Sequence, residues 1–320
     1  MVITGASSGI GRAAAYAFAE EGTRLVLTAR REGALQEVAD ACEERGASAV
    51  AVPADVTNEE ALQAVVELAE ERFGGIDVWV NNAAVTAFGR FEDVPAEDFR
   101  RVIETNFFGY VNGARAALGH FRERKRGVLI NVGSVVGAVP QPYTSAYVTS
   151  KWAIRGLNEC LRMEMALEDD LDIEVCHVAP ASIDTPLFQQ GANYTGRTPR
   201  ALDPTYAPEF VADVIVRVSH KPRRETVAGN AAYGLMGQHA VAPALYERTM
   251  ARKMDREHFK DQPAPRSKGN LYEPMEEYAA VRGGWEGKSS FDLGRAARIG
   301  AAVMLPALAV GAAIRQLQNR

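Results

Sequence analysis

The stretch Thr4-Gly5-Ala6-Ser7-Ser8-Gly9-Ile10-Gly11 decides the fold, because it follows a short strand pattern and opens a helical one. A glycine turn in this context directs backbone N–H groups and the positive end of a helix at a phosphate group. Gly5 permits the tight turn, Gly9 lets the backbone approach the phosphates, and Gly11 lets the helix pack close to the sheet. The turn predicts a dinucleotide site, although such a cluster can also be a plain flexible turn.

Strand and helix patterns alternate through the rest of the first two thirds of the chain. Apolar runs rich in β-branched residues predict strands over residues 25–28, 49–52, 78–80, 128–132 and 173–178. Apolar positions three and four residues apart predict helices over residues 10–22, 31–45, 58–73, 97–124 and 144–168. This alternation predicts right-handed crossovers and an α/β fold, in which helices cover both faces of a parallel sheet.

Composition narrows the classes of partner. The chain has 320 residues, a formal net charge of −5 and no extended run of Lys and Arg, so nucleic acid is not an expected partner. Cys42, Cys160 and Cys176 are widely separated and the chain has only five histidines, which argues against a metal cluster and for reduced thiols. The start of the chain has neither the basic nor the apolar stretch of a signal peptide, which predicts a cytoplasmic protein.

The end of the second predicted strand indicates which dinucleotide is bound. A chain that binds NAD usually has a carboxylate there, which holds the ribose 2′-hydroxyl. This sequence has Arg30 and Arg31 instead, with Arg12 nearby, and guanidinium groups pair well with a 2′-phosphate. The pattern predicts that NADP(H) is preferred over NAD(H). The alternative is that both arginines are solvated residues at the start of a helix.

A second motif carries acid–base chemistry. Tyr147 and Lys151 lie four residues apart in a predicted helix, so their side chains share one face. A free tyrosine has a pKa of about 10, and a neighbouring ammonium group favours the phenolate and lowers that pKa. Ser134 follows the strand 128–132 at its carboxyl end, where parallel sheets place their ligands, and its hydroxyl can bind a substrate oxygen. The spacing alone also occurs by chance on exposed helices.

Taken together, the motifs resemble the short-chain dehydrogenase/reductase family over roughly residues 1–230. The matching residues are Thr4-Gly5-xxx-Gly9-x-Gly11, Asp55-Val56, Asn81-Asn82-Ala83-Ala84, Asn106, Ser134 and Tyr147-xxx-Lys151. The resemblance implies a Rossmann-type doubly wound parallel sheet of about seven strands. It also implies an oxidoreductase that interconverts a ketone or aldehyde and a secondary alcohol by hydride transfer, with Tyr147 as general acid and base.

The resemblance further assigns roles at the site. Lys151 would also bind the nicotinamide ribose, and Asn106 would hold a water in a proton relay; the alternative for Asn106 is a purely structural hydrogen-bonded helix residue. The cofactor-binding set expected beside Lys151 and Tyr147 is Gly5, Ser7, Ser8, Gly9, Ile10, Gly11, Arg30, Arg31, Asp55, Val56, Asn82, Ala83, Ala84, Pro180, Ile183 and Thr185.

Two features depart from the family pattern. Ala181 stands where glycine is usual, and alanine in a left-handed turn would cost on the order of 1 kcal/mol. The first strand has only Met1 to Thr4 before the glycine turn, which is short for a central strand. We therefore expect the natural chain to begin upstream of Met1.

The pattern changes after residue 182. Residues 191–208 are rich in Gly, Pro, Thr and Asn and predict a mobile loop over a site. A helix is predicted over residues 209–219 and a last strand over 224–228. The chain is divided into a catalytic domain, residues 1–230, and a helical C-terminal extension, residues 231–320. In that extension a helical stretch, residues 231–262, precedes a polar linker to about residue 290.

An uncharged apolar segment, residues 299–314, is expected to form a tail helix. Its sixteen residues would reach about 24 Å, short of the hydrocarbon core of a bilayer, which is about 30 Å thick. A helix packed in the core or an oligomer interface is favoured over peripheral membrane contact. The family commonly forms dimers and tetramers, so a homo-oligomer is expected.

Two further readings of function remain open at this stage. One is a catalytically weak NADP(H)-binding sensor or membrane-associated scaffold with the same fold, against which the complete Ser-Tyr-Lys-Asn set argues. The other is oxidoreduction of a lipid-like or steroid-like substrate, motivated by the apolar tail and the long loop 182–208.

Overall fold

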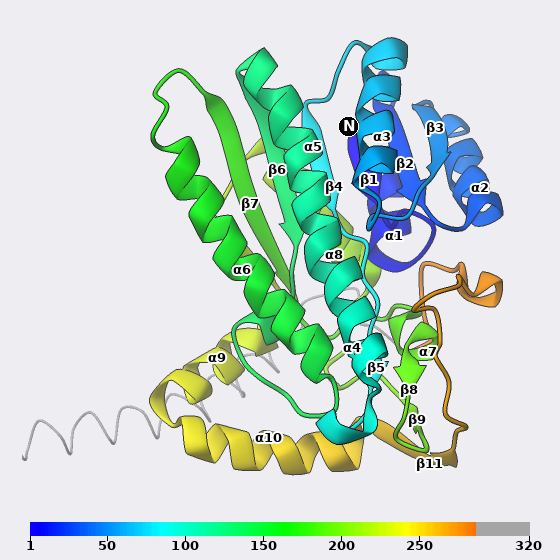
Figure 1. Ribbon diagram of the computed structural model, residues 1–320, viewed down its shortest axis with the longest axis vertical. Coiled ribbons are helices and arrows are strands. Elements are labelled where there is room, and N and C mark those ends of the chain that lie inside the picture. Colours follow the sequence, from blue (N-terminus) through cyan, green and yellow to red (C-terminus); the bar gives the residue numbers. More distant parts are fainter. Residues whose placement is uncertain (286–320) are drawn as a thin grey trace, which may run out of the picture.

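Seven parallel strands form the central sheet of the computed structural model, which describes residues 1–285 (Figure 1). The spatial order is β10-β7-β6-β4-β1-β2-β3. The strands are β1 (Val2–Thr4), β2 (Arg24–Ala29), β3 (Ser48–Pro53), β4 (Val78–Asn81), β6 (Arg126–Val132), β7 (Asp172–Pro180) and β10 (Glu225–Ala228). The strand order reverses at β1, which pairs with both β2 and β4. An open parallel sheet binds ligands at such a switch point, outside the carboxyl ends of its strands.

Helices cover both faces of the sheet, as the alternating pattern predicted (Figure 1). One face packs against α1 (Gly9–Phe18), α2 (Glu32–Glu43) and α8 (Pro208–His220). The other packs against α3 (Glu59–Phe73), α5 (Gly109–Arg124) and α6 (Ser145–Met165). Successive side chains of a strand point to opposite faces, so Val2 and Ile3 of the short strand β1 enter different cores, both fully buried. The Rossmann-type fold is confirmed.

The helix predicted over residues 97–124 contains a π-helical turn. The turn, Glu104–Phe108, joins α4 (Ala96–Ile103) to α5, and Asn106 lies buried within it. A π turn inserts one extra residue into a helix and often marks a functional position. Hydrophobic periodicity does not reveal it, because the helical ladder resumes directly afterwards.

The prediction of a single helical stretch over residues 231–262 is wrong. The structure has two helices, α9 (Ala231–Val241) and α10 (Pro243–Glu257), followed by a strand, β11 (Phe259–Pro263). Pro243 starts the second helix because it has no N–H to continue the first one. The break turns α10 under the lower end of the sheet in the view of Figure 1.

The expectation that residues 191–208 lack regular structure is also wrong. Two short strands lie in this region, β8 (Ala192–Asn193) and β9 (Arg197–Pro199). The first pairs with β5 (Ala87–Phe88) and the second pairs antiparallel with β11. Both partners are remote in sequence, so the local composition could not indicate this pairing.

After β11 the chain runs back along the switch-point edge of the sheet toward α1 and α2 (Figure 1). Apart from a 3-10 turn, Glu276–Tyr278, residues 264–285 contain no regular helix or named strand. No helix within residues 1–285 combines the length and the apolar character that a membrane span requires. The apolar segment 299–314 lies outside the described residues.

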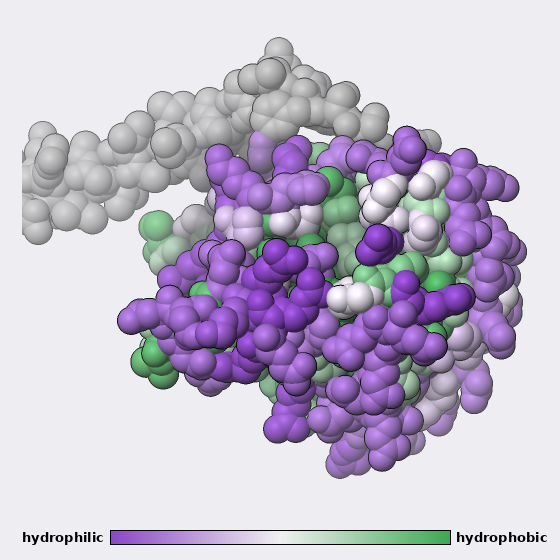
Figure 2. All heavy atoms as spheres, turned by 90° about the horizontal axis from the view of Figure 1, so that it is seen from above, coloured by the Kyte–Doolittle hydropathy of each residue, from purple (hydrophilic) through white to green (hydrophobic). Residues whose placement is uncertain are grey.

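The face of the molecule drawn in Figure 2 is mainly hydrophilic at its rim, and hydrophobic side chains gather toward its middle. Such a distribution is ordinary for a protein surface, much of which is always apolar.

Candidate active site

A cavity of about 470 Å³ opens at the carboxyl ends of the strands. Nearly all the residues that the sequence predicted for the site lie on its wall: Gly5, Ser7, Ser8, Gly9, Ile10, Arg30, Arg31, Asp55, Val56, Asn82, Ala83, Ala84, Ser134, Tyr147, Lys151, Pro180, Ile183 and Thr185. Gly11 and Asn106 do not line it. The cavity therefore joins the glycine turn and the proposed acid–base cluster in one space.

The glycine turn is closely packed against its own chain. Gly5 has a positive φ of 66°, and a Cβ atom there would lie 2.7 Å from the Cα atom of Ala83. A Cβ atom on Gly11 would lie 2.3 Å from the carbonyl oxygen of Gly5. No side chain fits at either position, so Gly11 is needed for packing against the turn although it does not line the cavity.

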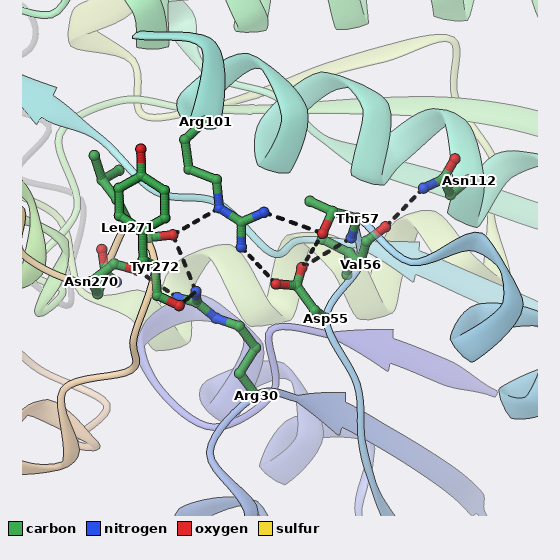
Figure 3. A network of polar contacts seen from close by, with 9 residues as sticks. All are labelled: Arg30, Asp55, Val56, Thr57, Arg101, Asn112, Asn270, Leu271 and Tyr272. Carbon is green, nitrogen blue, oxygen red and sulfur yellow. Dashed lines mark hydrogen bonds and ion pairs between the residues drawn. The ribbon is translucent and has the colours of Figure 1, made fainter. Parts of the chain in front are cut away.

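Arg30 and Arg31 follow the end of β2, as predicted, but their donors reach a segment far along the chain. Figure 3 shows these contacts for Arg30. Arg30 donates to the carbonyl oxygens of Asn270, Leu271 and Tyr272 at 2.6, 3.2 and 3.0 Å. Burial lowers the pKa of the Arg30 guanidinium group from its ordinary value. Carbonyl oxygens are neutral acceptors, so they hold the guanidinium group in place without removing its charge.

Arg31 has a similar arrangement. It donates to the carbonyl oxygen of Met275 at 2.8 Å and to the hydroxyls of Ser7 and Ser8 in the glycine turn. Arg12, the third predicted arginine, donates to the carbonyl oxygen of Ala279 at 2.6 Å and does not line the cavity. The two arginines at the end of β2 are thus those in a position to meet a ligand.

Asp55 belongs to a polar network at the same end of the cavity (Figure 3). Its carboxylate accepts hydrogen bonds from Thr57 and forms an ion pair of 2.6 Å with Arg101. Burial raises the pKa of Asp55, but the hydrogen bonds from Thr57 and Arg101 outweigh it and leave the pKa below its ordinary value. Arg101 also donates to the carbonyl oxygen of Leu271. The sequence offered no signal for Arg101, since it lies on a charged helix face.

Tyr147 and Lys151 lie one turn apart on α6 at the cavity wall, where Lys151 is fully buried and Tyr147 is half-buried. The Lys151 ammonium nitrogen lies 5.4 Å from the centre of the Tyr147 ring. Burial raises the pKa of Tyr147 to about 12, and a hydrogen bond with Ser134 opposes this rise. The spacing predicted a lowered pKa for Tyr147, and for the protein without a ligand this prediction is wrong. Burial disfavours the phenolate more than the hydrogen bond with Ser134 favours it. At neutral pH the side chain is a phenol.

Lys151 has partners that its sequence spacing did not indicate. Its ammonium group donates to the carbonyl oxygen of Val132 at 3.0 Å and contacts the hydroxyl of Tyr110 at 3.4 Å. Tyr110 is buried in α5 and donates to the same Val132 oxygen at 2.8 Å. Burial lowers the pKa of Lys151 to about 7. The available signal for Tyr110 was its position four residues after Asn106, on the same helix face.

Asn106 makes the hydrogen bonds expected of a structural helix residue, which was the alternative to a role in a proton relay. Its amide group donates to the carbonyl oxygen of Val85 and to the hydroxyl of Ser150, and its oxygen accepts from the Val85 N–H at 2.8 Å. These bonds join the segment after β4 to α6 just beside Lys151. Asn106 thus holds the helix that carries the cluster.

Ala181 does not adopt the conformation that its departure from glycine suggested. Among residues 1–285, the non-glycine residues with positive φ are Lys125 and Tyr143. The glycine that this region requires is Gly229, whose backbone packs against Ala181. A Cβ atom on Gly229 would lie 2.6 Å from the Cβ atom of Ala181. The expected strain at Ala181 is absent.

The C-terminal extension forms the far wall of the cavity, which the sequence did not indicate. Leu202 contributes from the loop, and Leu235, Tyr246 and Met250 contribute from α9 and α10. The spacing of four between Tyr246, Met250 and Met254 marked a buried helix face and was the available signal. An apolar side chain of a ligand fits such a wall.

The fold and the cavity together define an α/β oxidoreductase of the dinucleotide-binding class. A model of the short-chain dehydrogenase family matches residues 1–194. The uncharacterized oxidoreductase YxnA of Bacillus subtilis is 39% identical over 278 residues, which cover 85% of this chain and 77% of that protein. The chain belongs to the short-chain dehydrogenase/reductase family.

Solved structures of this family resemble the chain with either dinucleotide bound. An alcohol dehydrogenase from Thermococcus sibiricus complexed with 5-hydroxy-NADP has a TM-score of 0.61 and 29% identity, over 71% of this chain and 94% of that one. A short-chain dehydrogenase/reductase from Burkholderia phymatum in complex with NAD has a TM-score of 0.67 and 26% identity, over 77% and 94%. The likeness therefore does not distinguish NAD from NADP.

Proposed function

We propose that this protein is an NADP(H)-dependent oxidoreductase that interconverts a ketone or aldehyde and a secondary alcohol. One observation carries the proposal. Tyr147, Lys151 and Ser134 lie on the wall of the same cavity as the glycine turn, so a dinucleotide on that turn reaches the acid–base cluster.

In this proposal some residues of the cavity bind the substrate oxygen and one of them, Tyr147, also transfers a proton. A bound nicotinamide would supply a hydride to the carbonyl carbon, or accept one from the carbinol carbon in the opposite direction. Ser134 and Tyr147 bind the carbonyl oxygen, and Tyr147 donates its phenolic proton to that oxygen as the alcohol forms. In the opposite direction Tyr147 takes the hydroxyl proton. The hydrogen bond with Ser134 favours the phenolate that this direction needs.

Arg30 and Arg31 support the preference for NADP(H). Both lie on the cavity wall at the end of β2, where a carboxylate would be expected in a site for NAD(H). Their hydrogen bonds to backbone carbonyls orient the guanidinium groups and leave their positive charge in place for a 2′-phosphate.

The apolar wall supports a substrate whose carbonyl is attached to an apolar body. Leu202, Leu235 and Met250 line the cavity, and its charged lining residues from the same segments are Asp203 and Lys253. An uncharged ketone or secondary alcohol with an apolar substituent suits this lining better than a small charged metabolite.

A carbonyl and alcohol screen with NADPH and NADH tests the proposal. Oxidation of NADPH by at least one apolar ketone or aldehyde is expected. Deuterium placed at the transferring position of the nicotinamide should appear on the carbinol carbon of the product. Dinucleotide binding without any such transfer, across the whole screen, would support the sensor or scaffold reading instead.

A further inference from the structure

A segment of the C-terminal extension crosses the cofactor half of the cavity. We call residues 270–285 the strap; it appears in orange beside α1 and α2 in Figure 1. Three strap residues, Asn270, Pro274 and Met275, line the cavity. A chain segment from the far end of the sequence thus forms part of the wall around the proposed dinucleotide site.

The strap is fixed on the β2 side of the cavity by arginines and a buried acid. Arg30 and Arg31 donate to strap carbonyl oxygens at distances from 2.6 to 3.2 Å. The hydroxyl of Tyr272 donates to Asp98 at 2.8 Å, and Asp98 is fully buried. The residues that choose the dinucleotide are therefore the residues that hold the strap.

The strap is also fixed on the opposite, β7 side. The N–H groups of Gly283 and Trp285 donate to the carboxylate of Asp184 at 3.0 and 2.8 Å. The indole N–H of Trp285 donates to the carbonyl oxygen of Thr185 at 3.2 Å. Thr185 lines the cavity.

Between its two ends the strap contacts the glycine turn itself. The N–H of Gly9 donates to the carbonyl oxygen of Ala280 at 3.0 Å. The side chain of Gln190, which also lines the cavity, donates to the carbonyl oxygen of Tyr278 at 2.6 Å. The strap therefore spans from the end of β2, past the phosphate-binding turn, to the segment after β7.

We propose that the strap is a retaining wall of the cofactor site, which must undock before a dinucleotide can enter or leave. The inference rests on the proposed dinucleotide site and adds to it the element that controls exchange. The strap lies against the glycine turn along which a dinucleotide would extend, so entry or release would require the contacts on at least one side to break. A small carbonyl substrate is bounded by α9 and α10 instead and does not require this movement.

Gly283 does not itself line the cavity and offers a way to loosen the β7-side end of the strap. A Cβ atom there would lie 2.3 Å from the carbonyl oxygen of Thr185 and 2.7 Å from its carbon. Both are backbone atoms and cannot move aside, so Gly283→Ala should prevent docking of this end. Gly119→Ala is the matched control, because Gly119 lies in α5 and a Cβ atom there meets nothing within 4 Å.

The test measures dinucleotide release from the full chain, by stopped-flow fluorescence of bound NADPH chased with excess NADP⁺. Release from Gly283→Ala is expected to be about ten times faster than from the wild type, the size of effect that loss of about 1.4 kcal/mol of retention would produce. Release from Gly119→Ala should stay within about twofold, the scale of an ordinary surface substitution. Equal release rates for the wild type and Gly283→Ala would overturn the strap proposal.

Two further measurements keep this test independent of a folding defect and of the proposed function. Tyr272→Phe removes one strap hydrogen bond without a clash and should speed release about two- to threefold, a fraction of one net hydrogen bond; an unchanged rate counts against the strap. Saturating NADP⁺ should slow trypsin cleavage after Arg282 in the wild type, and unchanged cleavage would contradict the proposal. A wild type that binds neither NADPH nor NADH would instead refute the proposed function.

Discussion

The two ends of the cavity are built in opposite ways. At the proposed catalytic end Ser134, Tyr147 and Lys151 lie within eighteen positions of one another; Ser134 follows β6 by two residues, and the other two lie on α6. At the end proposed for the adenosine, Arg30, which directly follows β2, donates to Asn270 and its neighbours, about 240 positions away in sequence. Regular elements hold the proposed catalytic groups, whereas a segment without regular structure lines the proposed dinucleotide site.

The difference shows which functions a local pattern can carry. Helical periodicity places Tyr147 and Lys151 on one face wherever the helix packs. Enclosing a ligand site requires a second chain segment to pack against the first. The second segment contributes mostly backbone carbonyl oxygens, which any residue can supply. Changes at the catalytic end should therefore affect chemistry, and changes at the adenosine end should affect binding and exchange.

The largest effect is expected for Tyr147→Phe. Loss of the phenolic hydroxyl removes the proton donor, so kcat for carbonyl reduction should fall at least about 1,000-fold, while the Kd for NADPH should change little. Steady-state rates and a fluorescence titration of NADPH measure the two quantities. Activity equal to the wild type would contradict the proposed mechanism.

Lys151→Met should come next, with a loss of activity on the order of 100-fold. The same variant should be more stable than the wild type near pH 7, by on the order of 1 kcal/mol, because it no longer buries an ammonium group. The folded protein loses the Lys151 proton near pH 7, whereas the unfolded chain keeps it until about pH 10.5. Wild-type stability should therefore rise with pH across that window, and the advantage of the variant should shrink.

Urea unfolding at pH 7 and at about pH 9 measures this stability difference. A variant that is less stable than the wild type at both pH values would mean that the Lys151 hydrogen bonds outweigh its burial.

Arg30→Ala tests the other end of the cavity. It should raise the Kd for NADPH about tenfold more than the Kd for NADH, because one charge-assisted contact to a 2′-phosphate is lost. Arg12→Ala is the matched control, since Arg12 bonds to the strap at Ala279 without lining the cavity. The control should weaken both dinucleotides by similar factors. An equal loss for both dinucleotides in Arg30→Ala would refute the NADP preference.

The smallest effect is expected for Asn58→Ala in the scaffold. The Asn58 side chain caps α3 by accepting from the Ala61 N–H at 3.1 Å. Its loss should lower the free energy of unfolding by about 1 kcal/mol. The rate of NADPH release should not change, because α3 contributes no residue to the cavity wall. Faster release from this variant would show that general destabilisation, and not the strap, governs exchange.

Hydrophobic periodicity was sufficient for the sheet and its covering helices. It failed at three places, and each failure has its own physical reason. The π turn at Glu104–Phe108 adds one residue without interrupting the helix. Pro243 breaks the stretch 231–262 where the apolar pattern continues across the break. The strands β8 and β9 exist because remote strands pair with them, and their own composition is that of a loop.

At the site too, the sequence predicted which residues are present but not the environment that sets their pKa values. The Tyr147–Lys151 spacing predicted the pair of residues but not the raised pKa of Tyr147, because spacing does not report burial. Tyr110 and the far wall at Tyr246 and Met250 were likewise missed, since each reaches the site only after helices pack.

The sequence by itself determined the glycine turn, the alternation of strands and helices, and the shared helix face of Tyr147 and Lys151. Each of these depends on residues within a few positions of one another, where backbone geometry fixes the outcome. Only the tertiary structure decided that the extension forms the far wall and that the strap is bound to Arg30, Arg31 and Asp184. Those contacts join residues about 100 to 240 positions apart through backbone groups common to every residue, so no local pattern can encode them.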